Sequence, residues 1–213
     1  ISLGLVGSEM CIRDRNRDIF LRTLCLVAVT LFFTSAGASQ GEIILAVNTL
    51  LMQLFTLFSY VMDGFAYAGE ALSGRYIGAR NREAFTDTVR HLFGWGAVIA
   101  VLFTLVYALG GNAFLGLLTD DKEVIAVADT YFYWALAVPA VGIAAFIWDG
   151  IFIGATATRG MLLSMAAAAV SFFILYYGLR PVLANHALWL AFLTYLLMRG
   201  CLLYTSPSPR DRG

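Results

Sequence analysis

Residues 43–62 read Ile43-Ile-Leu-Ala-Val-Asn-Thr-Leu-Leu-Met-Gln-Leu-Phe-Thr-Leu-Phe-Ser-Tyr-Val-Met62 and contain no charged side chain. They begin an apolar segment that extends over residues 43–72. About 20 apolar residues cross the hydrocarbon core of a bilayer as an α-helix, because each residue adds 1.5 Å of length. The segment therefore predicts a transmembrane helix.

The rest of the chain repeats this pattern. Of the 213 residues, 60% are hydrophobic and 13% are charged, whereas a typical soluble domain has about half and a quarter. Turn-forming residues separate the apolar segments. The six segments are 19–37, 43–72, 88–110, 124–154, 160–179 and 185–200. We therefore predict an all-α fold, a polytopic transmembrane helix bundle with six spans.

The basic residues predict how the bundle lies in the membrane. If the first helix starts in the cytoplasm, eight arginines fall on the inner side and only Lys122 and Arg180 on the outer side, as the positive-inside rule requires. The inner set is Arg17, Arg22, Arg75, Arg80, Arg82, Arg90, Arg159 and Arg199. Splitting segment 124–154 at Pro139 would move Arg159 and Arg199 outside, so we predict one kinked span there.

The two ends of the chain can be read as one DNA element in opposite orientations. Residues 5–14, back-translated, reverse-complemented and read out of frame, give the sequence of residues 201–210. The element resembles an adapter used to prepare sequencing libraries. We therefore expect residues 1–15 and 201–213 to be non-native tails and residues 16–200 to be the natural part, with its last span cut short.

Two acids lie far from the predicted span ends. Asp63 precedes Arg75 by twelve residues and Asp149 precedes Arg159 by ten, which corresponds to depths of about 18 and 15 Å along a helix. A bare carboxylate at such depth costs roughly 2.5–3.5 kcal/mol, so it usually faces a protein interior or water and binds ions or substrate. A structural hydrogen bond between helices is the alternative for both. Each acid precedes a glycine, which predicts a close helix crossing at both places.

Three further residues are candidates for the same cavity. Glu70 follows Asp63 by seven residues, so it shares a helical face with Asp63, and Tyr67 lies between them. Glu70 can instead pair with the nearby Arg75 at the interface. Asn48 either contributes to the cavity or bonds to neighbouring helices.

The run Asp63-Gly-Phe-Ala-Tyr-Ala-Gly-Glu-Ala-Leu-Ser-Gly-Arg-Tyr-Ile-Gly-Ala79 resembles one helix of the multidrug and toxic compound extrusion (MATE) family, most of all its DinF branch. Four shorter matches follow the same order: Leu45-Ala-Val-Asn48, Leu117-Leu-Thr-Asp-Asp121, Asp149-Gly-Ile-Phe-Ile-Gly-Ala155 and Leu188-Trp-Leu-Ala-Phe192. Members of the family have about twelve spans in two lobes. The resemblance covers the second six-helix lobe, so the first lobe of the same chain would be missing.

The resemblance implies a secondary active antiporter in a bacterial inner (plasma) membrane. Such a protein exports amphipathic or cationic drugs or metabolites in exchange for protons or sodium ions by alternating access. Some members carry a cation-binding acid in the fourth helix of this lobe, and Asp149 lies in the matching stretch, which implies a Na⁺ site near it. Those members often add a glutamate in the first helix, whereas residues 19–37 contain no acid.

Other functions find less support in the sequence. We expect no enzyme, no cofactor, no metal cluster and no nucleic-acid partner, because the net charge is zero and the three cysteines lack metal-ligand spacing. An intramembrane aspartyl protease would need a Gly-x-Gly-Asp setting, which Asp63 and Asp149 lack. A flippase for lipid-linked precursors tends to have basic residues in its cavity, whereas we expect only acids at depth. That flippase and a non-transporting membrane subunit remain the alternatives.

Overall fold

The computed structural model describes residues 2–205, except for the side chains of residues 2–12, 14, 15 and 112. The described residues form six α-helices: α1 (Ser2–Ala38), α2 (Glu42–Gly78), α3 (Arg82–Leu118), α4 (Lys122–Gly154), α5 (Thr158–Leu183) and α6 (Asn185–Thr205). All six are long and apolar enough to cross a membrane. The predicted all-α bundle of six spans is confirmed. Part of the predicted tail 201–213 lies outside the described residues.

Capping side chains and an unusual backbone angle mark the starts of three helices. Asn81 accepts a hydrogen bond from the backbone N–H of Ala84, at 3.0 Å, and so caps α3. Asp121 caps α4 by accepting from the N–H of Glu123, at 2.9 Å. Gly41 precedes α2 with a φ of 119°, which a residue with a side chain rarely adopts. The third segment was predicted to end at residue 110, whereas α3 continues to Leu118.

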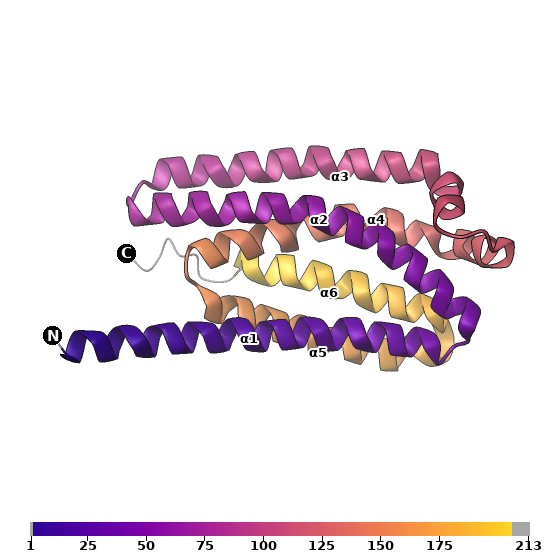
Figure 1. The fold of residues 1–213 in the computed structure, drawn as a ribbon, viewed down its shortest axis with the longest axis horizontal. Coiled ribbons are helices and arrows are strands. Elements are labelled where there is room, and N and C mark those ends of the chain that lie inside the picture. The colour runs from indigo at the N-terminus through magenta and orange to yellow at the C-terminus, as the bar shows by residue number, and fades with distance from the viewer. Residues whose placement is uncertain (1, 206–213) are drawn as a thin grey trace.

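The chain crosses the bundle back and forth, so the turns α2–α3 and α4–α5 lie at the same end as the start of α1 (Figure 1). We call this the predicted inner end. The helices α4 and α6 lie between the pair α2 and α3 and the pair α1 and α5. Helix α4 continues through Pro139. The prediction of one span over residues 124–154 is therefore confirmed.

The helices α2 and α4 are in backbone contact at two glycines of α4. A Cβ atom added to Gly150 would lie 2.1 Å from the carbonyl oxygen of Ala66, and one added to Gly154 would lie 2.2 Å from that of Glu70. Small residues let two helices approach this closely. The close crossing predicted after Asp149 is confirmed. A Cβ atom added to Gly64 would meet no atom of another helix within 4 Å, so the crossing predicted there is wrong. The contact brings Asp149 beside the α2 segment that carries Asp63 and Glu70.

Candidate functional site

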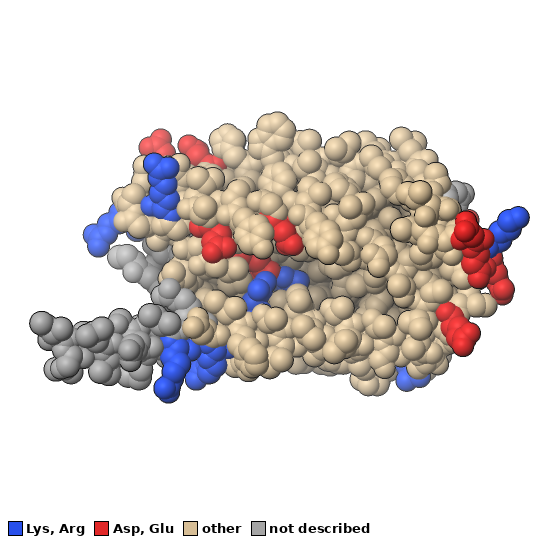
Figure 2. Space-filling model, viewed as in Figure 1, with Lys and Arg blue, Asp and Glu red and all other residues tan. Residues whose placement is uncertain are grey.

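A cavity of about 360 Å³ opens between α1, α2, α4 and α6. Figure 2 shows acidic and basic residues facing one another across a hollow, while the surface between this hollow and the charged ends of the molecule carries no Lys, Arg, Asp or Glu. The apolar part of the wall includes the rings of Phe55, Phe146 and Phe192. Its charged side chains are Arg22, Asp63, Glu70, Asp149 and Arg199. The cavity therefore combines aromatic surface with charges of both signs.

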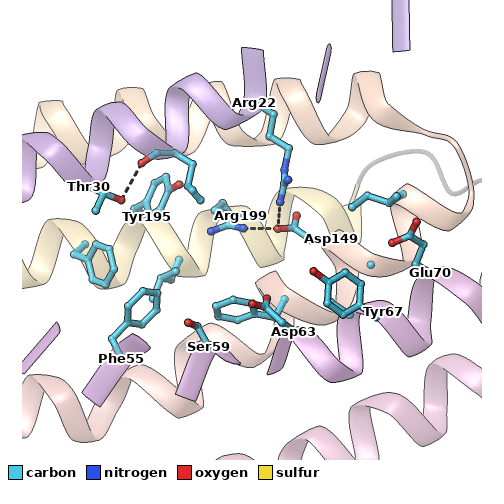
Figure 3. Close-up of a pocket in the computed structure, with 17 residues that line it drawn as sticks. Arg22, Thr30, Phe55, Ser59, Asp63, Tyr67, Glu70, Asp149, Tyr195 and Arg199 are labelled. Atoms are coloured by element: carbon cyan, nitrogen blue, oxygen red, sulfur yellow. Dashed lines mark hydrogen bonds and ion pairs between the residues drawn. The ribbon is translucent and has the colours of Figure 1, made fainter. Parts of the chain in front are cut away.

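Three of these residues form a buried charged cluster, Arg22–Asp149–Arg199 (Figure 3). Arg22 of α1 and Arg199 of α6 both donate hydrogen bonds to the same oxygen of Asp149, Oδ2. Asp149 is 7% exposed and Arg199 is 4% exposed. The cluster therefore connects α1, α4 and α6 through a single carboxylate.

The position of the two arginines differs from the prediction. The sequence pattern placed Arg22 and Arg199 with the surface charges of the inner side, and it led us to expect only acids at depth. Both guanidinium groups instead lie in the cavity. The predicted last span ended at residue 200, whereas α6 continues to Thr205, through part of the tail that we expect to be non-native. Arg199 lies in the cavity because α6 packs against α4.

Asp63, Tyr67 and Glu70 of α2 line the cavity together. Asp63 and Glu70 are partly buried and Tyr67 is exposed. In the part of the chain that the structure describes, neither Asp63 nor Glu70 has an ion pair, so Glu70 is not paired with Arg75. The cavity thus contains two carboxylates without a cation as partner.

Asn48 is not part of this cavity. It is 2% exposed and lies near the start of α2, where its amide oxygen accepts hydrogen bonds from Asn185 Nδ2 at 3.0 Å and Trp189 Nε1 at 2.9 Å. Its own amide nitrogen donates to Asn185 Oδ1 at 2.8 Å. The second interpretation of Asn48, a bond to neighbouring helices, is the one that the structure supports.

The depth of Asp149 also differs from the count along the chain. Helix α4 ends at Gly154, five residues after Asp149, which is about 8 Å along the axis rather than about 15 Å. Asp63 lies fifteen residues before the end of α2, about 22 Å along the axis. The two carboxylates nevertheless line one cavity, because α2 extends beyond the end of α4 at the predicted inner end (Figure 1).

A family model for MatE matches residues 19–179 of this chain. The chain belongs to the MatE family. The predicted family and its DinF branch are confirmed by the DNA damage-inducible protein F of Escherichia coli (strain K12), which is 43% identical over 185 residues. That alignment covers 87% of this chain and 40% of the relative. The chain thus spans less than half the length of this MatE relative.

More distant proteins agree on the MatE fold. Protein DETOXIFICATION 45, chloroplastic, of Arabidopsis thaliana is 26% identical over 62% of this chain and 24% of its own length. A crystal structure of a MATE protein in a bent conformation superimposes with a TM-score of 0.81 at 16% identity, over 95% of this chain and 46% of that one. At that identity the superposition supports the fold alone.

Proposed function

We propose that this chain is one lobe of a secondary active transporter that exports amphipathic small molecules, cationic ones among them, across a bacterial inner membrane. The export would run in exchange for protons or sodium ions, with a second lobe completing the substrate path. One observation carries the proposal: the carboxylates of Asp63 and Glu70, which have no ion pair among the described residues, line an aromatic-walled cavity between four apolar helices. The proposed export function agrees with membership of the MatE family.

The cavity suits the exchange of one cation for another. A carboxylate at a site poor in water favours a bound positive charge, and the rings of Phe55, Phe146 and Phe192 offer apolar contact to the rest of a drug-sized molecule. The same acid cannot hold a cationic substrate and a coupling ion at once. Asp63 is therefore our first candidate for the carboxylate that the cationic substrate and the coupling ion compete to bind.

Asp149 is our second candidate for coupling, and its partners suggest how it would act. Protonation of Asp149 would remove the charge that holds Arg22 and Arg199, so the link between α1, α4 and α6 would loosen. Two guanidinium groups at one carboxylate oppose the approach of a sodium ion and of a proton alike. The coupling ion can be tested directly, because export that continues when sodium is replaced by potassium or choline would indicate protons.

The test uses the complete transporter in inside-out membrane vesicles, with a fluorescent cationic dye as substrate. We expect Asp63→Asn and Asp149→Asn to abolish transport driven by an imposed proton gradient while the protein stays in the membrane. Asp120→Asn is the matched control, because Asp120 is exposed outside the cavity. Transport at the wild-type rate by the Asp149→Asn variant would contradict the coupling role of Asp149.

A flippase for lipid-linked precursors is the second candidate, because Arg22 and Arg199 supply the basic cavity residues that such a protein needs. This function predicts that the dye is not transported by the wild-type protein. It also predicts that a short-chain, fluorescent polyprenyl phosphate changes leaflet in proteoliposomes that contain the transporter.

A further inference from the structure

We propose that Arg22 and Arg199 form a subsite for an anionic group of the substrate, so that the transporter favours zwitterionic amphipaths over purely cationic ones. The inference rests on the export function proposed above and names the substrate class of that cavity. It has three requirements. The first is that the two guanidinium groups have unused hydrogen-bond donors, and the second is that a ligand can reach this pair of groups from the cavity. The third is that acids lie where a cationic group of the same ligand would reach.

The first requirement is met by the imbalance of charge in the cluster. Two guanidinium groups face one carboxylate and share its single oxygen Oδ2. Each guanidinium has five N–H donors. The Nε atoms of Arg22 and Arg199 are buried without a hydrogen-bond partner in the described part of the chain. A buried donor without a partner is costly, and an oxyanion from a ligand would remove that cost.

The second requirement is met by Arg22, whose side chain is 19% exposed and reaches the cavity from α1. Arg199 also lines the cavity but is almost fully buried, and its guanidinium lies 5.5 Å from the ring centre of Tyr195. This contact and the bond to Asp149 fix its position, so Arg199 supplies a fixed positive charge beside Arg22. Figure 3 shows the two arginines approaching Asp149 from different helices. A planar oxyanion can accept from such groups as Asp149 does.

The third requirement is met by the opposite wall. Asp63 and Glu70 lie on α2, across the cavity from the arginines of α1 and α6. A ligand with a carboxylate and an amine at separate places could contact both walls, and aromatic rings line the same cavity. A ligand with only a positive charge would leave the Nε donors of the two arginines without an acceptor.

Asp149 then binds the two arginines when the ligand's anionic group is absent. In the absence of substrate it neutralises part of the charge of Arg22 and Arg199. When a substrate carboxylate takes over one or both guanidinium groups, Asp149 loses the hydrogen bonds that they donate. Binding of the anionic group and release of Asp149 from α1 and α6 would therefore be linked.

The experiment measures equilibrium binding to the complete transporter in nanodiscs, by fluorescence anisotropy. The two probes are a rhodamine dye with a free carboxylate and its methyl ester, which differ only in that anionic group. We expect the wild type to bind the acid more tightly than the ester. We expect Arg22→Gln to lower the acid-to-ester affinity ratio by about tenfold or more. The variant should fold, because Arg199 still neutralises Asp149.

Two further variants complete the test. Asp149→Asn should raise the affinity for the acid dye, since the internal competitor is gone. Arg180→Gln removes an exposed arginine outside the cavity and should leave the affinity ratio unchanged. Equal losses of affinity for both dyes in the Arg22→Gln variant would overturn the proposed subsite. A wild type that binds the ester but not the acid would overturn it while leaving the export proposal intact. Binding of neither dye would overturn both.

Discussion

Two buried polar clusters connect helices in this lobe, and they differ in charge and in how completely they are paired. The Asn48–Asn185–Trp189 cluster is neutral, and its side-chain donors and acceptors bond to one another. The Arg22–Asp149–Arg199 cluster is charged, and both arginine Nε atoms lack partners in the described residues. Only the charged cluster borders the cavity. Complete pairing indicates a structural role, whereas incomplete pairing beside a cavity indicates a binding role.

The difference has an energetic reason. Moving charges out of water costs several kcal/mol per ion, and even a well-paired buried salt bridge is often no more stabilising than apolar residues of similar volume. A neutral amide cluster connects helices at a lower desolvation cost. Charge is therefore expected in the bundle where it serves a ligand or an ion, and the comparison can be tested by replacing one member of each cluster.

The largest effect on stability is expected from Asp149→Leu. It removes the carboxylate that both guanidinium groups share, and leaving such charges buried and unpaired costs about 3–5 kcal/mol. The measurement is the free energy of unfolding of the complete transporter in mixed micelles. Asp129→Asn, an exposed acid on the same helix, is the control. If Asp149→Leu lowered the free energy of unfolding by less than Asn48→Leu does, the proposed difference between the two clusters would be wrong.

A smaller loss is expected from Asn48→Leu. It leaves the polar groups of Asn185 and Trp189 without their partner, at a cost of about 1–3 kcal/mol. Dye transport per folded molecule should stay at the wild-type rate, since Asn48 lies outside the cavity. Thr49→Val is the matched control, because the Thr49 hydroxyl bonds only to Leu45 of its own helix. Loss of transport in the folded Asn48 variant would show that the neutral cluster also has a functional role.

The smallest effect on stability is expected from Asp63→Asn. Asp63 is partly buried and has no ion pair among the described residues, so the free energy of unfolding should change by less than about 0.5 kcal/mol. Loss of dye transport with unchanged stability would distinguish a functional carboxylate from a structural one. Destabilisation by more than about 1 kcal/mol would instead indicate a structural hydrogen bond.

Much of the architecture could be predicted from local patterns. Apolar length and turn residues predicted the six spans, and the spacing from Asp63 to Glu70 predicted their common wall. The charged cluster could not be predicted that way. Arg22 and Arg199 are distant in sequence from Asp149, and an arginine near the end of an apolar segment resembles an ordinary interfacial charge. In the sequence, this cluster was indicated only by the presence of two arginines and an acid on three separate spans.

The sequence by itself determined that this chain is helical, that it crosses a membrane about six times, and which acids are costly enough to matter. These properties depend on side-chain polarity and helical spacing, which act over a few residues. The tertiary structure decided which charges meet, because partners on α1, α4 and α6 are set by how the helices pack. The glycine contact between α2 and α4 brings Asp149 beside Asp63, and the packing of α6 against α4 and α5 brings Arg199 into the cavity.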